Sequence, residues 1–216
     1  MTHIIVLSMM PLFLSLAPSH FRQDLRSAPT NDAIRRELVK MGEENQKHRQ
    51  EILDLMDRLA KSDSEKVARK WQQAVERQKE LDSRNQQRLD EIVQQSGWPK
   101  KSVFGEEASG VAFSVVQHAE LDYQKKYFPL IKEAVAQKEA RDSDLAMLED
   151  RILTREGKKQ IYGTQARLNQ KTQLMELYPI EDEENVDDRR MKVGLEPLAQ
   201  YVKKAFGMEY TPPKKN

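Results

Sequence analysis

Two long stretches of the chain carry a side-chain pattern that fixes much of its architecture. Within residues 32–60 and again within 65–96, mostly apolar side chains return at alternating spacings of four and three residues. This spacing places them on one side of an α-helix, as in a coiled coil. The first stripe consists of Ile34, Leu38, Met41, Asn45, His48, Ile52, Leu55 and Leu59, and the second of Val67, Trp71, Ala74, Gln78, Leu81, Asn85, Arg88 and Ile92.

A short polar turn near residue 62 separates the two stretches, so we expect an antiparallel helical hairpin over residues 31–96. In that pairing Asn45 and His48 lie level with Gln78, and a polar layer interrupts the apolar seam. Two interpretations of the layer stay open. It fixes the register of the hairpin, as a buried Asn does in coiled coils, or it faces a pocket. The hairpin also offers a surface for self-association.

The composition limits the classes of protein that this chain can belong to. At 216 residues with 6% aromatic and 33% charged side chains, we expect one mainly helical domain, residues 31–206. The formal net charge of +1 gives no basic footprint, so we expect no nucleic-acid partner. The absence of cysteine excludes disulfides, zinc–thiolate sites and thiol nucleophiles.

The N-terminal residues predict export. An almost wholly apolar run over residues 4–17 has the length of a signal-peptide core and is too short for a membrane span of about 20 residues. We therefore expect a signal peptide at 1–19, a linker at 20–30 and a periplasmic or secreted protein with no stable membrane span after cleavage. No Lys or Arg precedes the run, which keeps an N-terminally anchored or cytoplasmic protein as the alternative.

Residues 97–206 are expected to form a helical core that bears the motifs. Gly97-Trp98-Pro99 ends the second long helix, because Gly is favoured just after a helix and Pro prevents its continuation. Helical stripes follow to about residue 156. Helices are also expected after the acidic segment 181–184 and near the C-terminus, before a disordered tail at 207–216.

Two short runs within this core, 160–165 and 173–178, alternate in polarity around a polar turn. This pattern predicts two paired strands. The expected fold class is therefore mainly α, with an N-terminal antiparallel helical hairpin plus a helical core that carries one small β-hairpin.

His118 is the candidate acid–base group. It follows Gln117 and stands four residues before Asp122, so that His118 and Asp122 share a face if the helix continues through both. A carboxylate beside an imidazole orients the ring and favours its protonated form. We expect His118 to be oriented by Asp122 or by Asp150, which makes His118 and Asp150 the candidate catalytic pair. The alternative is a surface ion pair or a structural hydrogen bond.

Arg151 is the candidate for holding an anion. Asp150 and Arg151 interrupt an otherwise apolar helical segment, so at least one of them lies near the buried boundary. The planar guanidinium of Arg151 suits a carboxylate or phosphate group. The alternative is a structural ion pair with Asp150 or with the acidic segment 181–184.

The run 160–165 supplies the candidate specificity residues. On a strand, Gln160, Tyr162 and Thr164 project from one face and Gln165 from the other. Three hydrogen-bonding side chains on one face can line a polar pocket or face water. Gly163 allows a ligand or another part of the chain to approach closely.

Other kinds of chemistry find little support in the sequence. Outside the N-terminal segment only His48 and His118 are histidines, and no metal-ligand spacing stands out, so we expect no metal and no cofactor. No Gly-x-Ser-x-Gly element, phosphate-binding loop or dinucleotide fingerprint is present.

The order of these motifs resembles an uncharacterised bacterial domain family of unknown function. The similar elements are Gly97-Trp98-Pro99, Gln117-His118-Ala119, Asp150-Arg151, the run from Gln160 to Gln165 and Gly194-Leu195, over residues 34–202. The resemblance implies a shared architecture and a shared polar site but no reaction. Members that are similar to this chain carry Asp where Glu120 stands, which argues against a strict role for Glu120.

Two functions are consistent with these residues. The first is binding of a small polar or anionic ligand by Gln117, Asp122, Arg151, Gln160, Tyr162, Thr164 and Gln165, either alone or with hydrolytic or transfer chemistry at His118 and Asp150. The second is a non-catalytic structural or protein-interaction module that uses the helical hairpin.

Overall fold

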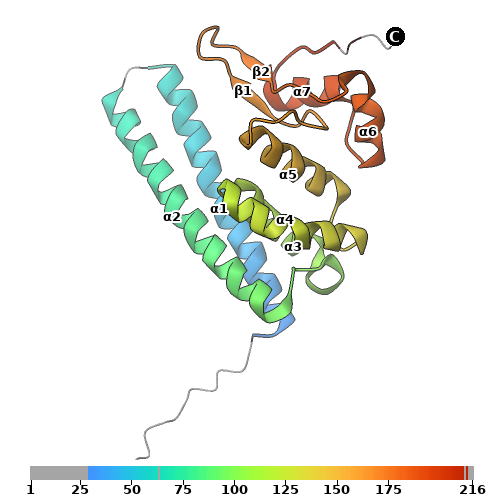
Figure 1. Ribbon diagram of the computed structural model, residues 1–216. Helices are drawn as coiled ribbons and strands as arrows, with labels where there is room; N and C mark the ends of the chain where they lie inside the picture. Colours follow the sequence, from blue (N-terminus) through green and yellow to red (C-terminus); the bar gives the residue numbers. More distant parts are fainter. Residues whose placement is uncertain (1–28, 63, 212, 214–216) are drawn as a thin grey trace, which may run out of the picture.

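A computed structural model of the protein describes residues 29–62, 64–211 and 213. In these residues seven α-helices, a 3-10 helix and a two-stranded antiparallel sheet follow one another (Figure 1). This confirms the expected mainly α fold with one small sheet. The elements are α1 (Asn31–Ala60), α2 (Glu65–Ser96), α3 (Lys101–His118), α4 (Leu121–Ala136), α5 (Asp142–Arg155), β1 (Ala166–Leu168), β2 (Met175–Leu177), η1 (Glu183–Asn185), α6 (Val186–Lys192) and α7 (Leu198–Phe206).

Helices α1 and α2 form the antiparallel hairpin along one side of the molecule (Figure 1). Ion pairs join them in reversed order along the chain, Glu37 with Arg88 at 2.6 Å and Glu44 with Arg84 at 3.1 Å. Exposed ion pairs contribute little to stability, so burial of the two apolar stripes is what holds the helices together. Gly97 ends α2 with a φ of 72°, a value that glycine adopts without strain.

The polar layer of the hairpin brings Asn45 and Gln78 together. The Gln78 side-chain amide donates to Asn45 Oδ1 at 3.1 Å, and Arg49 Nε donates to the same oxygen at 2.7 Å. Asp82 completes the layer, because Asn45 Nδ2 donates to it at 3.3 Å and Arg49 forms an ion pair with it at 3.3 Å. The layer therefore fixes the position of the Arg49 side chain as well as the level at which the helices pair.

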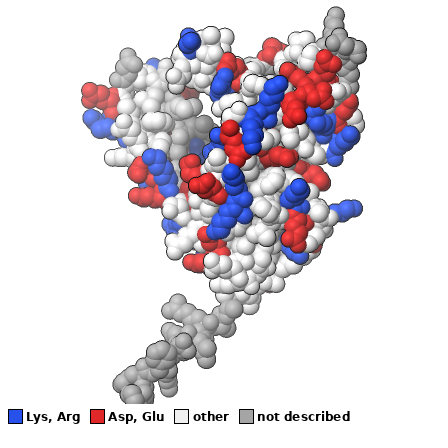
Figure 2. All heavy atoms as spheres, viewed as in Figure 1, with Lys and Arg blue, Asp and Glu red and all other residues white. Residues whose placement is uncertain are grey.

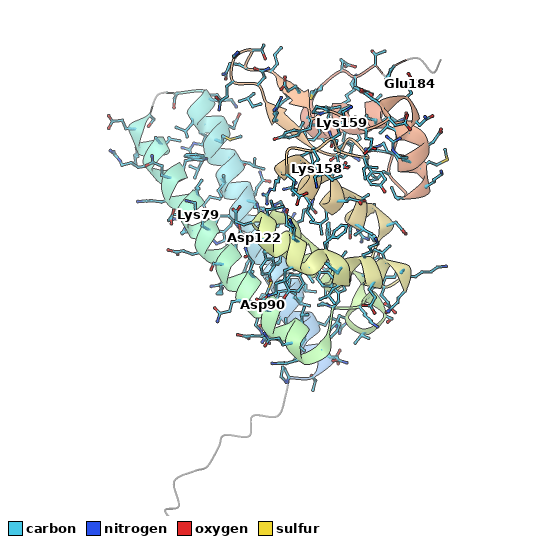
Figure 3. All side chains as sticks on the ribbon, viewed as in Figure 1. Lys79, Asp90, Asp122, Lys158, Lys159 and Glu184 are labelled. Atoms are coloured by element: carbon cyan, nitrogen blue, oxygen red, sulfur yellow. The ribbon has the colours of Figure 1, made fainter. Side chains whose placement is uncertain are left out.

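Helices α3, α4 and α5 pack beside the hairpin and share its main hydrophobic core. Helix α4 is tied to α2 through Asp90, which accepts hydrogen bonds from Tyr123 at 2.8 Å and Tyr127 at 2.5 Å and pairs with Lys126 at 2.8 Å (Figure 3). Trp98, which follows α2, is buried against Tyr127 with ring centroids 6.2 Å apart. The Gly-Trp-Pro motif thus serves the core.

The C-terminal part has a small core of its own. Ile180, Val186, Leu198 and Val202 are buried together between the β-hairpin, α6 and α7. The tail predicted from residue 207 includes Met208 and Tyr210, which pack against this cluster.

The predicted strands are placed partly wrongly. The second run contains the strand Met175–Leu177, as expected, but this strand pairs with Ala166–Leu168 and not with the first run. Residues 160–165 form a loop in which Gln160 makes one isolated bridge, to Ile180. Gly163 is one cause, because its φ of 75° is incompatible with an extended strand. A Cβ at this position would lie 2.8 Å from Leu198 Cδ1, so the close approach predicted at Gly163 is made by the α7 side chain.

The predicted signal peptide and most of the predicted linker lie outside the described residues. Among the residues that are described, no helix has both the length and the hydropathy needed to cross a membrane. On the face shown in Figure 2, acidic and basic side chains are intermixed.

Helices α1 and α3 are closely packed at Gly42. A Cβ built on Gly42 would lie 2.5 Å from Val111 Cγ2 on α3. Ala is favoured over Gly inside a helix by ~1 kcal/mol, whereas overpacking costs ~1–3 kcal/mol. We predict that Gly42→Ala lowers the free energy of unfolding by about 1 kcal/mol, measured by urea denaturation.

Gly110 provides the matched control for this substitution. It also lies within a helix, but no atom lies within 4 Å of a Cβ built on it. Gly110→Ala should therefore raise the free energy of unfolding by up to ~1 kcal/mol. Equal effects of the two substitutions would contradict the close packing of α1 on α3.

Candidate functional site

The loop 160–165 is held by the carboxylate of Asp150, which is fully buried on α5. Asp150 accepts hydrogen bonds from the backbone amides of Ile161 at 2.6 Å, Tyr162 at 3.0 Å and Thr164 at 2.9 Å. The Thr164 hydroxyl donates to it at 2.9 Å. A buried carboxylate needs such donors to replace its lost hydration, and here the loop backbone supplies nearly all of them.

The carbonyl groups of the same loop face arginines of α6. Arg190 is fully buried and donates to the Tyr162 carbonyl at 2.6 Å, while Arg189 Nε donates to the Ile161 carbonyl at 3.0 Å. The peptide groups of the loop therefore lie between a buried anion on α5 and cations on α6. This arrangement couples α5 to the C-terminal part of the chain.

Three predicted ligand-binding side chains serve this loop instead. The Gln160 amide donates to the carbonyls of Gln165 at 3.0 Å and Tyr178 at 2.8 Å, and its oxygen accepts from the Gln165 amide at 2.8 Å. The Thr164 hydroxyl, besides donating to Asp150, accepts from Gln165 Nε2 at 2.9 Å. The polar groups of Gln160, Thr164 and Asp150 therefore form hydrogen bonds within the fold. This structural role explains why these polar residues interrupt an apolar pattern.

His118 and Asp122 do not share a helix face as predicted. Helix α3 ends at His118 and α4 begins at Leu121, because Ala119 and Glu120 have extended backbones with ψ of 172° and 162°. The side chain of the neighbouring Gln124 caps this break by donating to the Gln117 carbonyl at 2.8 Å. Asp122 is exposed in the first turn of α4 (Figure 3) and does not contribute to the pKa of His118.

Asp150 also does not orient His118, since its two oxygens accept from the loop. Tyr162 donates its backbone amide to Asp150, and burial together with the charges of Glu149 and Asp150 raises the pKa of its hydroxyl. The predicted set thus separates into a loop-fixing group around Asp150 and a second group that contains His118 and Arg151.

The second group is a cluster of cations. Burial of the imidazole lowers the pKa of His118 to about 4, and the charges of Arg49 of α1 and of Arg151 and Arg155 of α5 add to this shift. Part of the His118 residue still reaches solvent. The imidazole is therefore neutral at pH 7, contrary to the protonated form expected beside a carboxylate.

Arg151 lies at the centre of this arginine cluster, which we define as Arg49, His118, Arg151 and Arg155. Burial lowers the pKa of Arg151, and the charges of Arg155 and Arg49 lower it further. Within the described part of the chain no carboxylate contributes to that pKa, and Arg151 Nε is buried without a hydrogen-bond partner. Neither structural ion pair expected as the alternative for Arg151 is formed: Asp150 binds the loop, and Asp182 pairs with Arg189 at 3.1 Å.

The other members of the cluster are held in place by the fold. Arg49 is fixed by Asn45 and Asp82, so the polar layer of the hairpin holds this member of the cluster in place. Arg155 Nη1 donates to the Ala119 carbonyl at 2.7 Å, which ties α5 to the break between α3 and α4. Among the described residues, the carboxylate of Asp82 thus pairs with Arg49, and no ion pair is formed by Arg151 or Arg155.

Tyr201 of α7 forms the wall opposite the hairpin. Its hydroxyl donates to the Thr164 carbonyl at 3.2 Å, and its ring lies 4.8 Å from the Arg190 guanidinium carbon. Arg151 and Tyr201 are close enough to influence each other's pKa. The surface is hollowed between the hairpin and the C-terminal part (Figure 2), where the end of α5 lies (Figure 1).

The sequence prediction missed Arg49, Arg155 and Tyr201. A signal was present for two of them, because Arg155 follows Arg151 by four residues on the same helix face and Arg49 follows Asn45 by four on α1. No local pattern connects Tyr201 with these residues. In the described residues no group of three or more His, Asp or Glu side chains is placed to hold a metal ion.

Comparison with known proteins identifies a family whose function is unknown. Residues 31–210 match the family of unknown function DUF6624. Neither the curated proteins nor the solved structures contain a match to the chain.

The hydrogen bonds to Asp150 predict that even the isosteric substitution Asp150→Asn strongly lowers the stability of the protein. In Asp150→Asn one carboxylate oxygen becomes an NH₂ group that faces backbone N–H groups, so buried donors lose their acceptor. We expect the free energy of unfolding to fall by about 3 kcal/mol, which lowers the melting temperature by about 6–12 °C for a protein of this size. Asp122→Asn, at an exposed position, should change stability by less than ~0.5 kcal/mol. Similar melting temperatures for the two variants would contradict this role of Asp150.

The cationic surroundings of His118 predict its titration. By NMR of the imidazole nitrogens, His118 should stay neutral from about pH 8 to about pH 5 and protonate only near pH 4. Because the folded-state pKa lies below the unfolded value of 6.5, acidification between these values lowers the free energy of unfolding. His118→Gln should lack that part of the pH dependence. Arg151→Met should raise the pKa of His118, and an unchanged pKa in this variant would contradict the proximity of Arg151.

Proposed function

Because the chain belongs to DUF6624, a family of unknown function, its activity must be inferred from its own site, and we propose that it binds a small anionic ligand at the arginine cluster. A carboxylate or phosphate group fits the fork of a guanidinium through two parallel hydrogen bonds. Arg151 is the main contact, with Arg49 and Arg155 on either side and the neutral imidazole of His118 as a hydrogen-bonding neighbour.

The observation that carries this proposal is the missing counter-charge of Arg151. Buried or half-buried arginines are normally paired, because dehydrating a cation is costly. Arg151 instead has two further arginines as its charged neighbours in the described residues. Such an arrangement is unfavourable in the free protein and becomes favourable when an anion enters.

Binding is supported better than catalysis. Acid–base chemistry at His118 would need a group that orients its imidazole, and both predicted partners are engaged elsewhere or exposed. A neutral imidazole can still accept a proton from a bound ligand or donate one to it. Hydrolysis or group transfer at this site is therefore a second step, which would follow binding of the ligand.

The test is the melting temperature in inorganic phosphate against chloride of equal ionic strength. At phosphate concentrations of about 100 times Kd the folded state gains ~2.7 kcal/mol, a rise of about 5–10 °C for a protein of this size. Arg151→Met should abolish the rise. Arg84→Met, which removes an exposed arginine of the hairpin, should retain it.

Without phosphate, Arg151→Met should melt no lower than the unaltered protein, because the substitution removes a partly buried cation that lacks a partner. The competing view, a purely structural or interaction module, requires that Arg151→Met lowers the melting temperature and that phosphate acts equally on all three proteins. That result would disprove the anion site.

A further inference from the structure

A groove between α1 and α3 shares Arg49 with the arginine cluster. It has a volume of about 590 Å³ and is bordered by Arg49 and Leu53 of α1 and by Ser114 and Val115 of α3. Volumes of this order are usual for small-molecule sites. The sequence did not predict the groove, whose lining includes Gly42 and Val111, where the two helices are in close contact.

The direction of the groove follows from the contact between Gly42 and Val111. Arg49 lies seven residues after Gly42, and His118 lies seven residues after Val111. Seven residues are close to two helical turns, so each residue returns to the same helix face about 10 Å further on. Arg49 and His118 are also neighbours electrostatically. The two helices therefore run in parallel, and the part of the groove that contains Arg49 lies toward His118.

The lining of the groove changes character along its length. Its floor is apolar and includes Val39, Val111 and Val115. The small side chains of the neighbouring Gly110 and Ser114 leave space above this floor. Arg49 lies toward one end of the groove, with Gln50 and Leu53 beyond it. The carboxylates of Glu43, Glu106 and Glu107 lie toward the other end, where Glu106 is paired at 3.1 Å with Arg141, which also lines the groove.

We infer that the anion is the head of an amphiphilic monoanion, a carboxylate with an unbranched apolar chain that lies in this groove. This inference rests on the proposed function, since the head occupies the arginine cluster. The apolar floor favours a hydrocarbon chain. Arg141 is already paired with Glu106. Among the described residues Glu43 and Glu107 have no ion-pair partner, so their carboxylates repel a second negative group and disfavour a dicarboxylate of the same length.

The length of the chain follows from the helix. Glu43 precedes Arg49 by six residues, which corresponds to about 9 Å along α1. An eight-carbon monocarboxylate fits this length. Octanoate therefore serves as the probe, acetate as the head without the chain, and suberate, the eight-carbon dicarboxylate, as the probe for the acidic end.

The experiment is isothermal titration of the unaltered protein with the three acids below any micelle concentration. A fully buried methylene improves affinity about fourfold. Even with partial burial in an open groove, octanoate should bind at least tenfold tighter than acetate and should compete with inorganic phosphate. Suberate should bind at least tenfold more weakly than octanoate.

A matched pair of variants locates the chain. Ser114→Leu fills the floor of the groove and should reduce octanoate affinity to that of acetate while leaving acetate unchanged. Ser83→Leu makes the same change on an exposed part of α2 and should leave both unchanged. Far-UV circular dichroism checks that each variant folds, and the comparison of octanoate with suberate needs no variant.

The outcomes separate this inference from the proposed function. If acetate and phosphate bind at Arg151 but octanoate binds no tighter, or if suberate equals octanoate, the amphiphile is wrong and the anion site stands. Octanoate binding that is unaffected by Ser114→Leu likewise overturns it, because the chain then lies elsewhere. If none of the anions binds, both the inference and the proposed function fail.

Discussion

The position of the candidate site depends on the buried carboxylate of Asp150. A charge at this depth is tolerated only when polar groups replace its hydration, and the amides of loop 160–165 do so. The carbonyls of the same loop accept from Arg189 and Arg190. The loop is thereby polarised between opposite charges, which strengthens both sets of hydrogen bonds in a low-dielectric interior. Through it, α5 and the C-terminal part hold a defined relation to one another.

This bond also determines the direction of Arg151. Successive residues on a helix point about 100° apart, so when Asp150 faces the loop, Arg151 turns toward the hairpin. Arg155, one turn later, follows it. The negative charge of Asp150 is compensated by hydrogen bonds from the loop, whereas the positive charges of Arg151 and Arg155 meet a third arginine, Arg49, and a neutral His118. The excess of cations is thus a consequence of how α5 is anchored.

The sequence was informative where the structure depends on local spacing. The four-three stripes predicted both long helices, their antiparallel pairing and the meeting of Asn45 with Gln78. The breaks at Gly97 and in the acidic segment before α6 follow from the conformational preferences of single residues. Family membership agrees with the resemblance drawn from the motif order.

Prediction failed where long-range contacts override a local pattern. Residues 160–165 alternate like a strand, but Asp150 captures their amides and Gly163 turns the backbone. The four-residue spacing of His118 and Asp122 suggested a shared face, yet the helix ends between them. The neighbours of Arg151 in space include Arg49 of α1 and Tyr201 of α7, about 100 residues before it and 50 after it in the sequence. No local sequence pattern indicates that residues so far apart meet.

The central claim is that Arg151 lacks a partner in the free protein and gains one when an anion binds. The Nε–H resonance of Arg151, assigned by comparison with Arg151→Met, reports this hydrogen bond directly. On titration with inorganic phosphate at constant ionic strength, this resonance should move downfield in a saturable way, while the resonance of Arg49, already bonded to Asn45, moves less. An Arg151 Nε–H signal that stays in place throughout the titration would contradict the account.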